Sequence, residues 1–121
     1  MAKKILIADD DQEIIDFLNV TLDMGGYNVI SVQHGGQVPA AVKKEKPDLL
    51  ILDVLMPGLD GYSLMLYLAQ QNDTKNIPVI VASALPATRS LFEKFQQVKV
   101  FFDKPFDSDK LLDKVREILG E

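Results

Sequence analysis

The sequence predicts an α/β fold, a doubly wound parallel sheet of five strands with helices on both faces. Short apolar runs alternate five times with longer segments whose apolar residues recur at helical spacing. Strands that alternate with helices in this way form parallel sheets. The runs at residues 48–53 and 78–82 are also apolar almost throughout, as expected for strands buried on both faces. The length of 121 residues suits one domain, which we expect to cover residues 1–121.

Composition narrows the classes of function. The net charge is −5, with acidic and basic residues interspersed, which argues against direct binding of nucleic acid. The chain has no cysteine, so disulfides and thiolate metal sites are excluded. No apolar run approaches the roughly 20 residues that span a bilayer, and the amino terminus has no cleavage site of the kind found in signal peptides. We therefore expect a cytoplasmic protein without a membrane partner.

The strands and the first two helices follow from apolar runs and turn residues. The expected strands cover residues 3–8, 27–32, 48–53, 78–82 and 98–102. The first helix should lie between an N-cap at Asp11 and a stop at Gly25-Gly26. The second should begin near Pro39, since the missing N–H of proline costs nothing in a first turn, and end near Pro47.

The remaining helices are marked by caps and apolar faces. The third should begin at Asp60 or Gly61, after the turn Met56-Pro57-Gly58. The fourth is expected from Pro86 to Phe95, with only a narrow apolar side. The last, capped by Asp107 or Ser108, has an apolar face made by Leu111, Leu112, Val115, Ile118 and Leu119.

Polar side chains gather at the predicted carboxyl ends of the strands, where open α/β sheets bind their ligands. Asp9 and Asp10 follow the first strand, Asp53 ends the third, Ser83 follows the fourth and Lys104 follows the fifth. If the first and third strands are neighbours, three carboxylates share one pocket and either take up a proton or bind a cation. Oxygen ligands alone select a hard cation such as Mg²⁺. These groups suit phosphoryl transfer with Asp53 as the nucleophile.

Five features in order give a resemblance to a known family. They are ILIADD near the start, LLILDVLMPGLDG in the middle, PVIVASA, FFDKPF, and the five-fold strand–helix order. Over essentially its whole length the chain resembles the receiver domain of two-component response regulators. The resemblance implies a flavodoxin-like (βα)5 fold with strand order 2-1-3-4-5.

The resemblance also implies roles for the acidic residues. Asp53 would be the phosphoacceptor and a Mg²⁺ ligand. Asp10 would bind Mg²⁺ directly, Asp9 mainly through water, and the backbone carbonyl of Leu55 would be a further ligand.

Three more positions match functional residues of the family. Ser83 would be the switch hydroxyl that turns toward the phosphoryl group. Lys104 would pair with the phosphate and precede a cis peptide bond to Pro105. Phe101 would be the aromatic residue that swings inward with Ser83.

By resemblance, the function is that of a phosphoacceptor signalling module. A phosphohistidine of a sensor histidine kinase or a phosphotransfer protein would donate its phosphoryl group to Asp53 with Mg²⁺ bound. The face formed by the fourth helix, fifth strand and fifth helix would then change its affinity for a downstream protein or output domain. The chain would catalyse only its own phosphorylation and dephosphorylation, so it is not an enzyme in the usual sense.

Some positions depart from the family pattern. Phe101 replaces the commoner Tyr, and the Gly-Ala turn before the fifth strand is missing, which leaves the fourth helix uncertain in shape. Leu55 and Leu85 flank the expected phosphoryl site without polar groups to orient water, which predicts a slowly hydrolysed acyl phosphate. His34 is expected to be a loop residue without a role.

Two alternative functions stay open, a protein-docking module and an enzyme. A receiver that serves only for docking is disfavoured by the complete set of site residues. An aspartyl-nucleophile phosphohydrolase needs a second Asp where this chain has Leu55.

Overall fold

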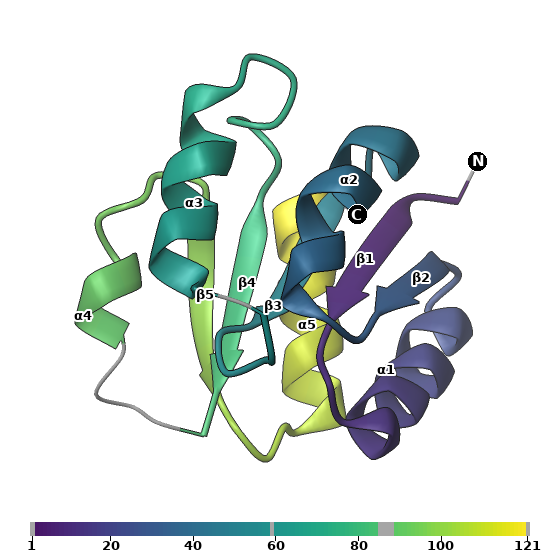
Figure 1. Ribbon diagram of the computed structural model, residues 1–121. Helices are drawn as coiled ribbons and strands as arrows, with labels where there is room; N and C mark the ends of the chain where they lie inside the picture. The colour runs from purple at the N-terminus through teal and green to yellow at the C-terminus, as the bar shows by residue number, and fades with distance from the viewer. Residues whose placement is uncertain (1, 59, 85–88, 121) are drawn as a thin grey trace.

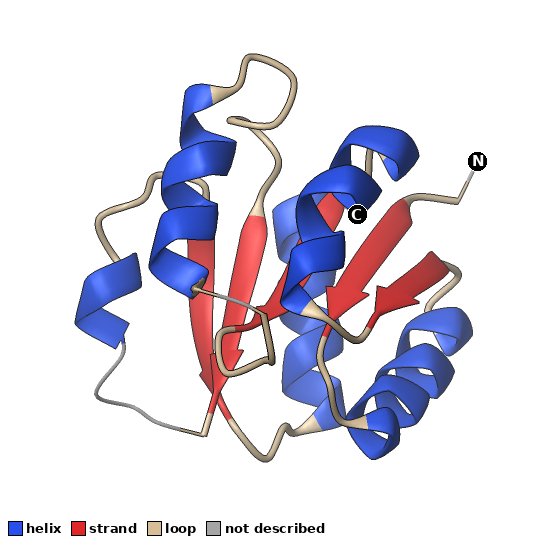
Figure 2. Ribbon diagram, in the orientation of Figure 1, coloured by secondary structure: helices blue, strands red, loops and turns tan. Residues whose placement is uncertain are grey.

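The computed structural model describes residues 2–58, 60–84 and 89–120 and forms the predicted α/β sandwich (Figures 1 and 2). The strands are β1 (Lys4–Ala8), β2 (Asn28–Val32), β3 (Leu49–Asp53), β4 (Val79–Ser83) and β5 (Val98–Asp103). The helices are α1 (Gln12–Met24), the 3-10 turn η1 (Gly35–Gln37), α2 (Val38–Glu45), α3 (Gly61–Gln70), α4 (Arg89–Phe92) and α5 (Ser108–Leu119).

The sheet is parallel throughout and its order is β2-β1-β3-β4-β5. This confirms the predicted order, with β2 at one edge and the fully buried β3 at the centre. The arrowheads in Figure 2 all point the same way, so the carboxyl ends of the five strands lie along one edge of the sheet.

Alternate side chains of each strand enter two separate cores. Leu6, Leu50 and Val81 pack on the face covered by α2, α3 and α4. Ile7 and Ile51 pack on the opposite face, against α1 and α5. This alternation follows from the two-residue period of a strand, and continuous apolar runs in the sequence are its direct result.

Helix ends follow the predicted caps. Asp11, Asp60 and Asp107 each accept a backbone hydrogen bond in the first turn of α1, α3 and α5. Helix α2 ends where Lys46 adopts a left-handed conformation with φ of 48°, directly before Pro47. Within the parts of the chain that the structure describes, no helix has the length and apolar character needed to cross a membrane.

The fourth helix is shorter than the sequence pattern predicts. The prediction ran from Pro86 to Phe95, but α4 ends at Phe92, and Pro86 lies outside the described residues. Beyond Phe92 the chain turns, and the backbone N–H of Phe95 donates to the carbonyl of Phe92 at 3.1 Å. Phe92 and Phe95 are both buried, so the apolar spacing that suggested a longer helix is shared between the end of α4 and a turn that returns to the core.

The central strand should dominate stability. Leu50 is fully buried between β1 and β4, and replacing it by Ala leaves a cavity that the packed sheet cannot fill. We expect Leu50→Ala to lower the free energy of unfolding by about 2–5 kcal/mol, measured by urea denaturation. Met24→Ala, at an exposed position on α1, is the control and should change it by less than about 0.5 kcal/mol.

Candidate functional site

The order of the strands brings three carboxylates together. Strands β1 and β3 are neighbours, with Ala8 opposite Leu52, so the residues that follow these strands meet at the sheet edge. One oxygen from each of Asp9, Asp10 and Asp53 lies within 4.8 Å of the others. The predicted acidic cluster therefore exists.

Two members of the cluster are nearly buried. Asp9 is 2% exposed and Asp53 is 5% exposed, whereas Asp10 faces solvent. Asp9 also accepts a hydrogen bond from the backbone N–H of Asp11 at 2.9 Å, which joins the pocket to the start of α1. Buried charges require partners, and the pocket supplies one cation.

Lys104 is that cation, and it arrives from the end of β5. Its Nζ lies 2.8 Å from Oδ2 of Asp9 and 3.1 Å from Oδ2 of Asp53. Its backbone N–H donates to the carbonyl of Ser83 at 3.0 Å. The peptide bond to Pro105 is cis, as predicted.

The pKa values of Lys104 and Asp53 are both raised, but for different reasons. Burial by itself lowers the pKa of Lys104, but hydrogen bonds and attraction from Asp9 and Asp53 outweigh it, so the pKa is raised. Burial raises the pKa of Asp53 above its ordinary value, despite the hydrogen bond from the Leu55 N–H and the nearby Lys104 charge, while the charge of Asp9 adds to the rise. The fold thus holds Asp53 in a place where its negative charge is under-compensated.

The donor set fits a hard divalent cation. Three carboxylates lie together and Lys104 contacts two of them, which leaves an excess of negative charge, and every ligand atom that the cluster offers is an oxygen. Mg²⁺ prefers oxygen ligands and commonly binds through one or two carboxylates together with water and phosphate oxygens. The partly open position of Asp10 leaves room for such ligands.

The other predicted residues surround this cluster. Ser83 is fully buried at the end of β4, next to β5, where it stands opposite Asp103. Leu55 donates its backbone N–H to Oδ1 of Asp53 at 2.9 Å and is 48% exposed. Leu85 lies outside the described residues.

Phe101 lies on the edge strand β5 and is half-buried. The Arg89 guanidinium covers its ring at 5.0 Å from the centroid. Phe101 is thus partly accessible to a partner, whereas Phe92 and Phe95 are buried.

The interpretation of His34 as a residue without a role was wrong in one respect. Its Nδ1 accepts a hydrogen bond from the backbone N–H of Gly36 at 3.0 Å and caps η1. The dipeptide Gly35-Gly36 was a signal for a turn, but nothing in the sequence indicated that the imidazole would close it.

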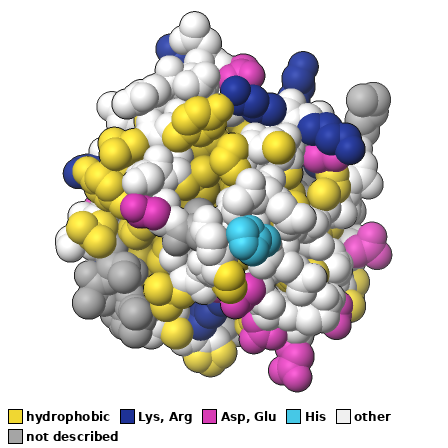
Figure 3. Space-filling model, viewed as in Figure 1, with side chains coloured by type: hydrophobic (Ala, Val, Ile, Leu, Met, Phe, Trp, Pro, Cys, Tyr) yellow, Lys and Arg dark blue, Asp and Glu magenta, His cyan; other side chains and the backbone are white. Residues whose placement is uncertain are grey.

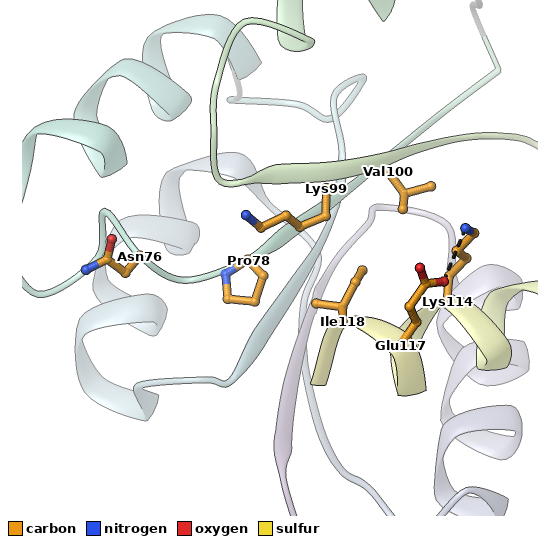
Figure 4. Close-up of a pocket in the computed structure, with 7 residues that line it drawn as sticks. All are labelled: Asn76, Pro78, Lys99, Val100, Lys114, Glu117 and Ile118. Carbon is orange, nitrogen blue, oxygen red and sulfur yellow. Dashed lines mark hydrogen bonds and ion pairs between the residues drawn. The ribbon is translucent and has the colours of Figure 1, made fainter. Parts of the chain in front are cut away.

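A separate hollow of about 550 Å³ lies between β5 and α5 (Figure 4). Pro78, directly before β4, lines it together with Lys99, and Lys114 is paired there with Glu117. Since Pro78 precedes β4, this hollow is near the amino end of that strand and apart from the acidic cluster.

Comparison with known proteins identifies the family. A model of the response regulator receiver domain matches residues 5–116. The chain belongs to the response regulator receiver domain family. Receiver domains act in two-component signalling, and the fold and the acidic cluster of this receiver domain agree with that function.

Individual relatives resemble this receiver domain at moderate identity. Protein PilH of Pseudomonas aeruginosa is 32% identical over 118 residues, which cover 97% of this chain and 98% of PilH. The DNA-binding dual master transcriptional regulator RpaA of Synechocystis is 33% identical over 96% of this chain. The chain spans about half the length of RpaA and of the other curated transcriptional regulators it matches.

Solved structures show the same arrangement. A putative response regulator from Chloroflexus aurantiacus superposes with a TM-score of 0.90 at 30% identity, with full coverage of both chains. The response regulator TrrA from Thermotoga maritima, solved in complex with Mg²⁺-BeF, gives a TM-score of 0.84 at 27% identity and covers 96% of this receiver domain and 98% of TrrA.

Proposed function

We propose that Asp53 accepts a phosphoryl group from a phosphohistidine of a sensor histidine kinase or phosphotransfer protein, and that residues 1–121 form one self-contained receiver domain for this purpose. The observation that carries the proposal is Lys104 Nζ, held between Asp9 and Asp53 beside the open carboxylate of Asp10. A nucleophile, a cation and two further carboxylates thus lie at the same edge of the sheet.

Mg²⁺ would be held by Asp10 and Asp53, with Asp9 acting mainly through water and the Leu55 carbonyl as a further ligand. When bound, it would supply positive charge to the phosphoryl oxygens. The close approach of three carboxylates supports this assignment, because the excess negative charge needs a cation.

The chain's own groups account for the transfer itself. An oxygen of the Asp53 carboxylate forms the new P–O bond as the P–N bond of the donor breaks. The donor imidazole carries a proton on its other ring nitrogen before the transfer, so it takes the electron pair of the P–N bond and leaves as neutral imidazole. Lys104 exchanges one carboxylate contact for a phosphoryl oxygen, and the Ser83 hydroxyl donates a hydrogen bond to another. No other substrate is turned over, so the chain catalyses only its own phosphorylation and dephosphorylation.

The output would come from a shift between two conformations. Contacts from the phosphoryl group to Ser83 and Lys104 exist in only one state, so they bias the equilibrium toward it. Phe101 lies in β5 beneath Arg89, where a movement of either ring or guanidinium alters the face of α4, β5 and α5. That face would bind the downstream protein or output domain.

The direct test is incubation with phosphoramidate, a small-molecule phosphodonor, and Mg²⁺, followed by intact mass. We expect a mass gain of one phosphoryl group that hydroxylamine removes, as acyl phosphates require, and that EDTA prevents. Mg²⁺ alone should raise the unfolding free energy by about 2.7 kcal/mol at one hundred times its dissociation constant. Absence of the mass gain with folded protein would contradict the proposal.

The exposed Leu55 side chain should control the lifetime of the product. It stands next to Asp53 and offers no group that orients water, so we expect slow hydrolysis. Leu55→Asn introduces such a group, and one positioning hydrogen bond of about 1.4 kcal/mol corresponds to a roughly tenfold faster loss. Decay of phosphorylated protein after removal of the donor measures this, with Leu66→Asn on α3 as the control. A wild-type lifetime of seconds would count against the slow-hydrolysis expectation.

A further inference from the structure

Two loops from neighbouring parts of the chain are joined next to the acidic cluster. The His34 turn (residues 33–37) connects β2 to α2, and the β3 exit segment (residues 54–58) leads away from Asp53. The backbone N–H of Gly35 donates to the carbonyl of Pro57 at 2.9 Å. Figure 1 shows the connection before α2 beside the loop that follows β3.

The imidazole of His34 lies directly against Gly58. A β-carbon at position 58 would be 2.6 Å from Nε2 and 2.8 Å from Nδ1 of His34, closer than nonbonded atoms approach. Gly58 also has φ of +73°, which favours glycine. Backbone conformation therefore favours glycine here, and the three atoms nearest to a β-carbon at this position all belong to the His34 ring, which would have to move to make room for it.

A hydrogen bond within the His34 turn orients the imidazole ring. Nδ1 accepts the Gly36 N–H at 3.0 Å, which fixes the imidazole across the turn. His34 is an exposed residue, and the single histidine is visible on the surface in Figure 3. Even so, one edge of its ring accepts a hydrogen bond within the His34 turn, and one side of the ring lies against Gly58.

The β3 exit segment is thus held at both of its ends. At the far end it is fixed by Gly35 and His34, and at the near end the Leu55 N–H donates to Oδ1 of Asp53 at 2.9 Å. A segment of five residues with fixed ends has little freedom to rotate the Leu55 peptide. The orientation of that N–H in turn sets how the Asp53 carboxylate faces Asp9, Asp10 and Lys104.

We propose that His34 is a positioning residue for Asp53, acting through Gly58 and the β3 exit segment to set the affinity of the acidic cluster for Mg²⁺. The inference rests on the proposed function, in which Asp53 is a Mg²⁺ ligand. His34 touches neither the metal nor the phosphoryl group in this role.

The test uses His34→Asn, because Asn retains an oxygen that can accept the Gly36 N–H but lacks the ring that meets Gly58. We expect its Mg²⁺ dissociation constant to rise about tenfold, as when supporting contacts around a metal site are lost, with the stability of the metal-free protein little changed. Isothermal titration calorimetry and urea denaturation measure these two quantities separately. Gln37→Ala, at an exposed position in the same turn, is the matched control.

A double-mutant cycle with Gly58→Ala tests the contact itself. In the His34 background the new methyl meets both the ring and the backbone strain, whereas in the His34→Asn background only the strain remains. We expect the effect of Gly58→Ala on the unfolding equilibrium to be about tenfold smaller in the second background. Equal effects in both backgrounds would show that the ring does not press on Gly58, and would overturn the inference.

These measurements separate the inference from the proposed function. Mg²⁺ binding and the cycle need no phosphodonor, so a wild-type protein that binds Mg²⁺ but takes no phosphoryl group rejects the function and leaves the contact testable. An unchanged Mg²⁺ dissociation constant in His34→Asn, beside a wild type that is phosphorylated, rejects the positioning role alone.

Discussion

Replacing Asp53 by asparagine is expected to abolish uptake of a phosphoryl group from phosphoramidate. The amide that replaces the carboxylate is not a nucleophile under these conditions. The other two carboxylates of the cluster do not follow β3, and the Leu55 N–H donates to Asp53. Intact mass after incubation with Mg²⁺ measures the effect. Asp60→Asn, an exposed N-cap on α3 that asparagine can also form, should be phosphorylated like the wild type.

Although Asp53→Asn should abolish phosphorylation, it should raise the free energy of unfolding of the metal-free protein. Because burial raises the pKa of Asp53 in the folded state, the stability it contributes is fully present below the unfolded pKa of about 3.9 and is lost as pH rises through the folded pKa. At neutral pH without metal, Asp53→Asn should therefore be more stable than the wild type. Added Mg²⁺ should raise the free energy of unfolding of the wild type more than that of the variant. A metal-free variant less stable than the wild type would contradict this account of Asp53.

Replacing Lys104 by methionine should damage both stability and chemistry. It removes the cation that contacts two nearly buried carboxylates at 2.8 Å and 3.1 Å, and breaking a buried ion pair leaves its partner charge uncompensated. We expect the metal-free unfolding free energy at neutral pH to fall by about 3 kcal/mol, and phosphorylation at saturating Mg²⁺ to slow by about a hundredfold.

The pH dependence of this effect follows from the raised pKa of Lys104. Its contribution is fully present below the unfolded pKa of about 10.4 and lost as pH rises through the folded pKa, so neutral pH shows the whole effect. Urea denaturation and timed intact-mass measurements report the two quantities. Lys99→Met, exposed on the same strand, is the control; equal losses in both variants would show that the effect comes from removing a positive charge on β5 and not from the contacts of Lys104.

The acidic site could be read from the sequence because each part leaves a local signal. The apolar run before Asp53 predicts a buried strand, and Asp9 and Asp10 follow a second such run. In a parallel sheet both positions must reach the same edge, so proximity needs only the order of the strands. Lys104 was placed at the same edge because it follows the fifth apolar run, and its pairing with the phosphate was implied by the family motif around it, since a lone lysine has no such signal.

Other features depend on contacts between distant segments and left no comparable signal. The spacing of Phe92 and Phe95 suggested one continuous helix, yet α4 ends at Phe92 and Phe95 enters the core from the turn that follows. The contact of His34 with Gly58 requires two loops to meet, and glycine after proline has an ordinary explanation as a turn residue. In both cases a local sequence pattern is typical of one structure, but contacts between distant segments determine the structure that forms.

The ion pair between Asp9 and Lys104 joins positions 95 residues apart, and this separation has a consequence for synthesis. A ribosome-bound chain that ends before β5 carries every acidic group of the cluster but not the cation that contacts two of them. Such a nascent chain cannot form the contacts of Lys104 with Asp9 and Asp53, so the ion-paired form of the cluster exists only after residue 104 has left the ribosome.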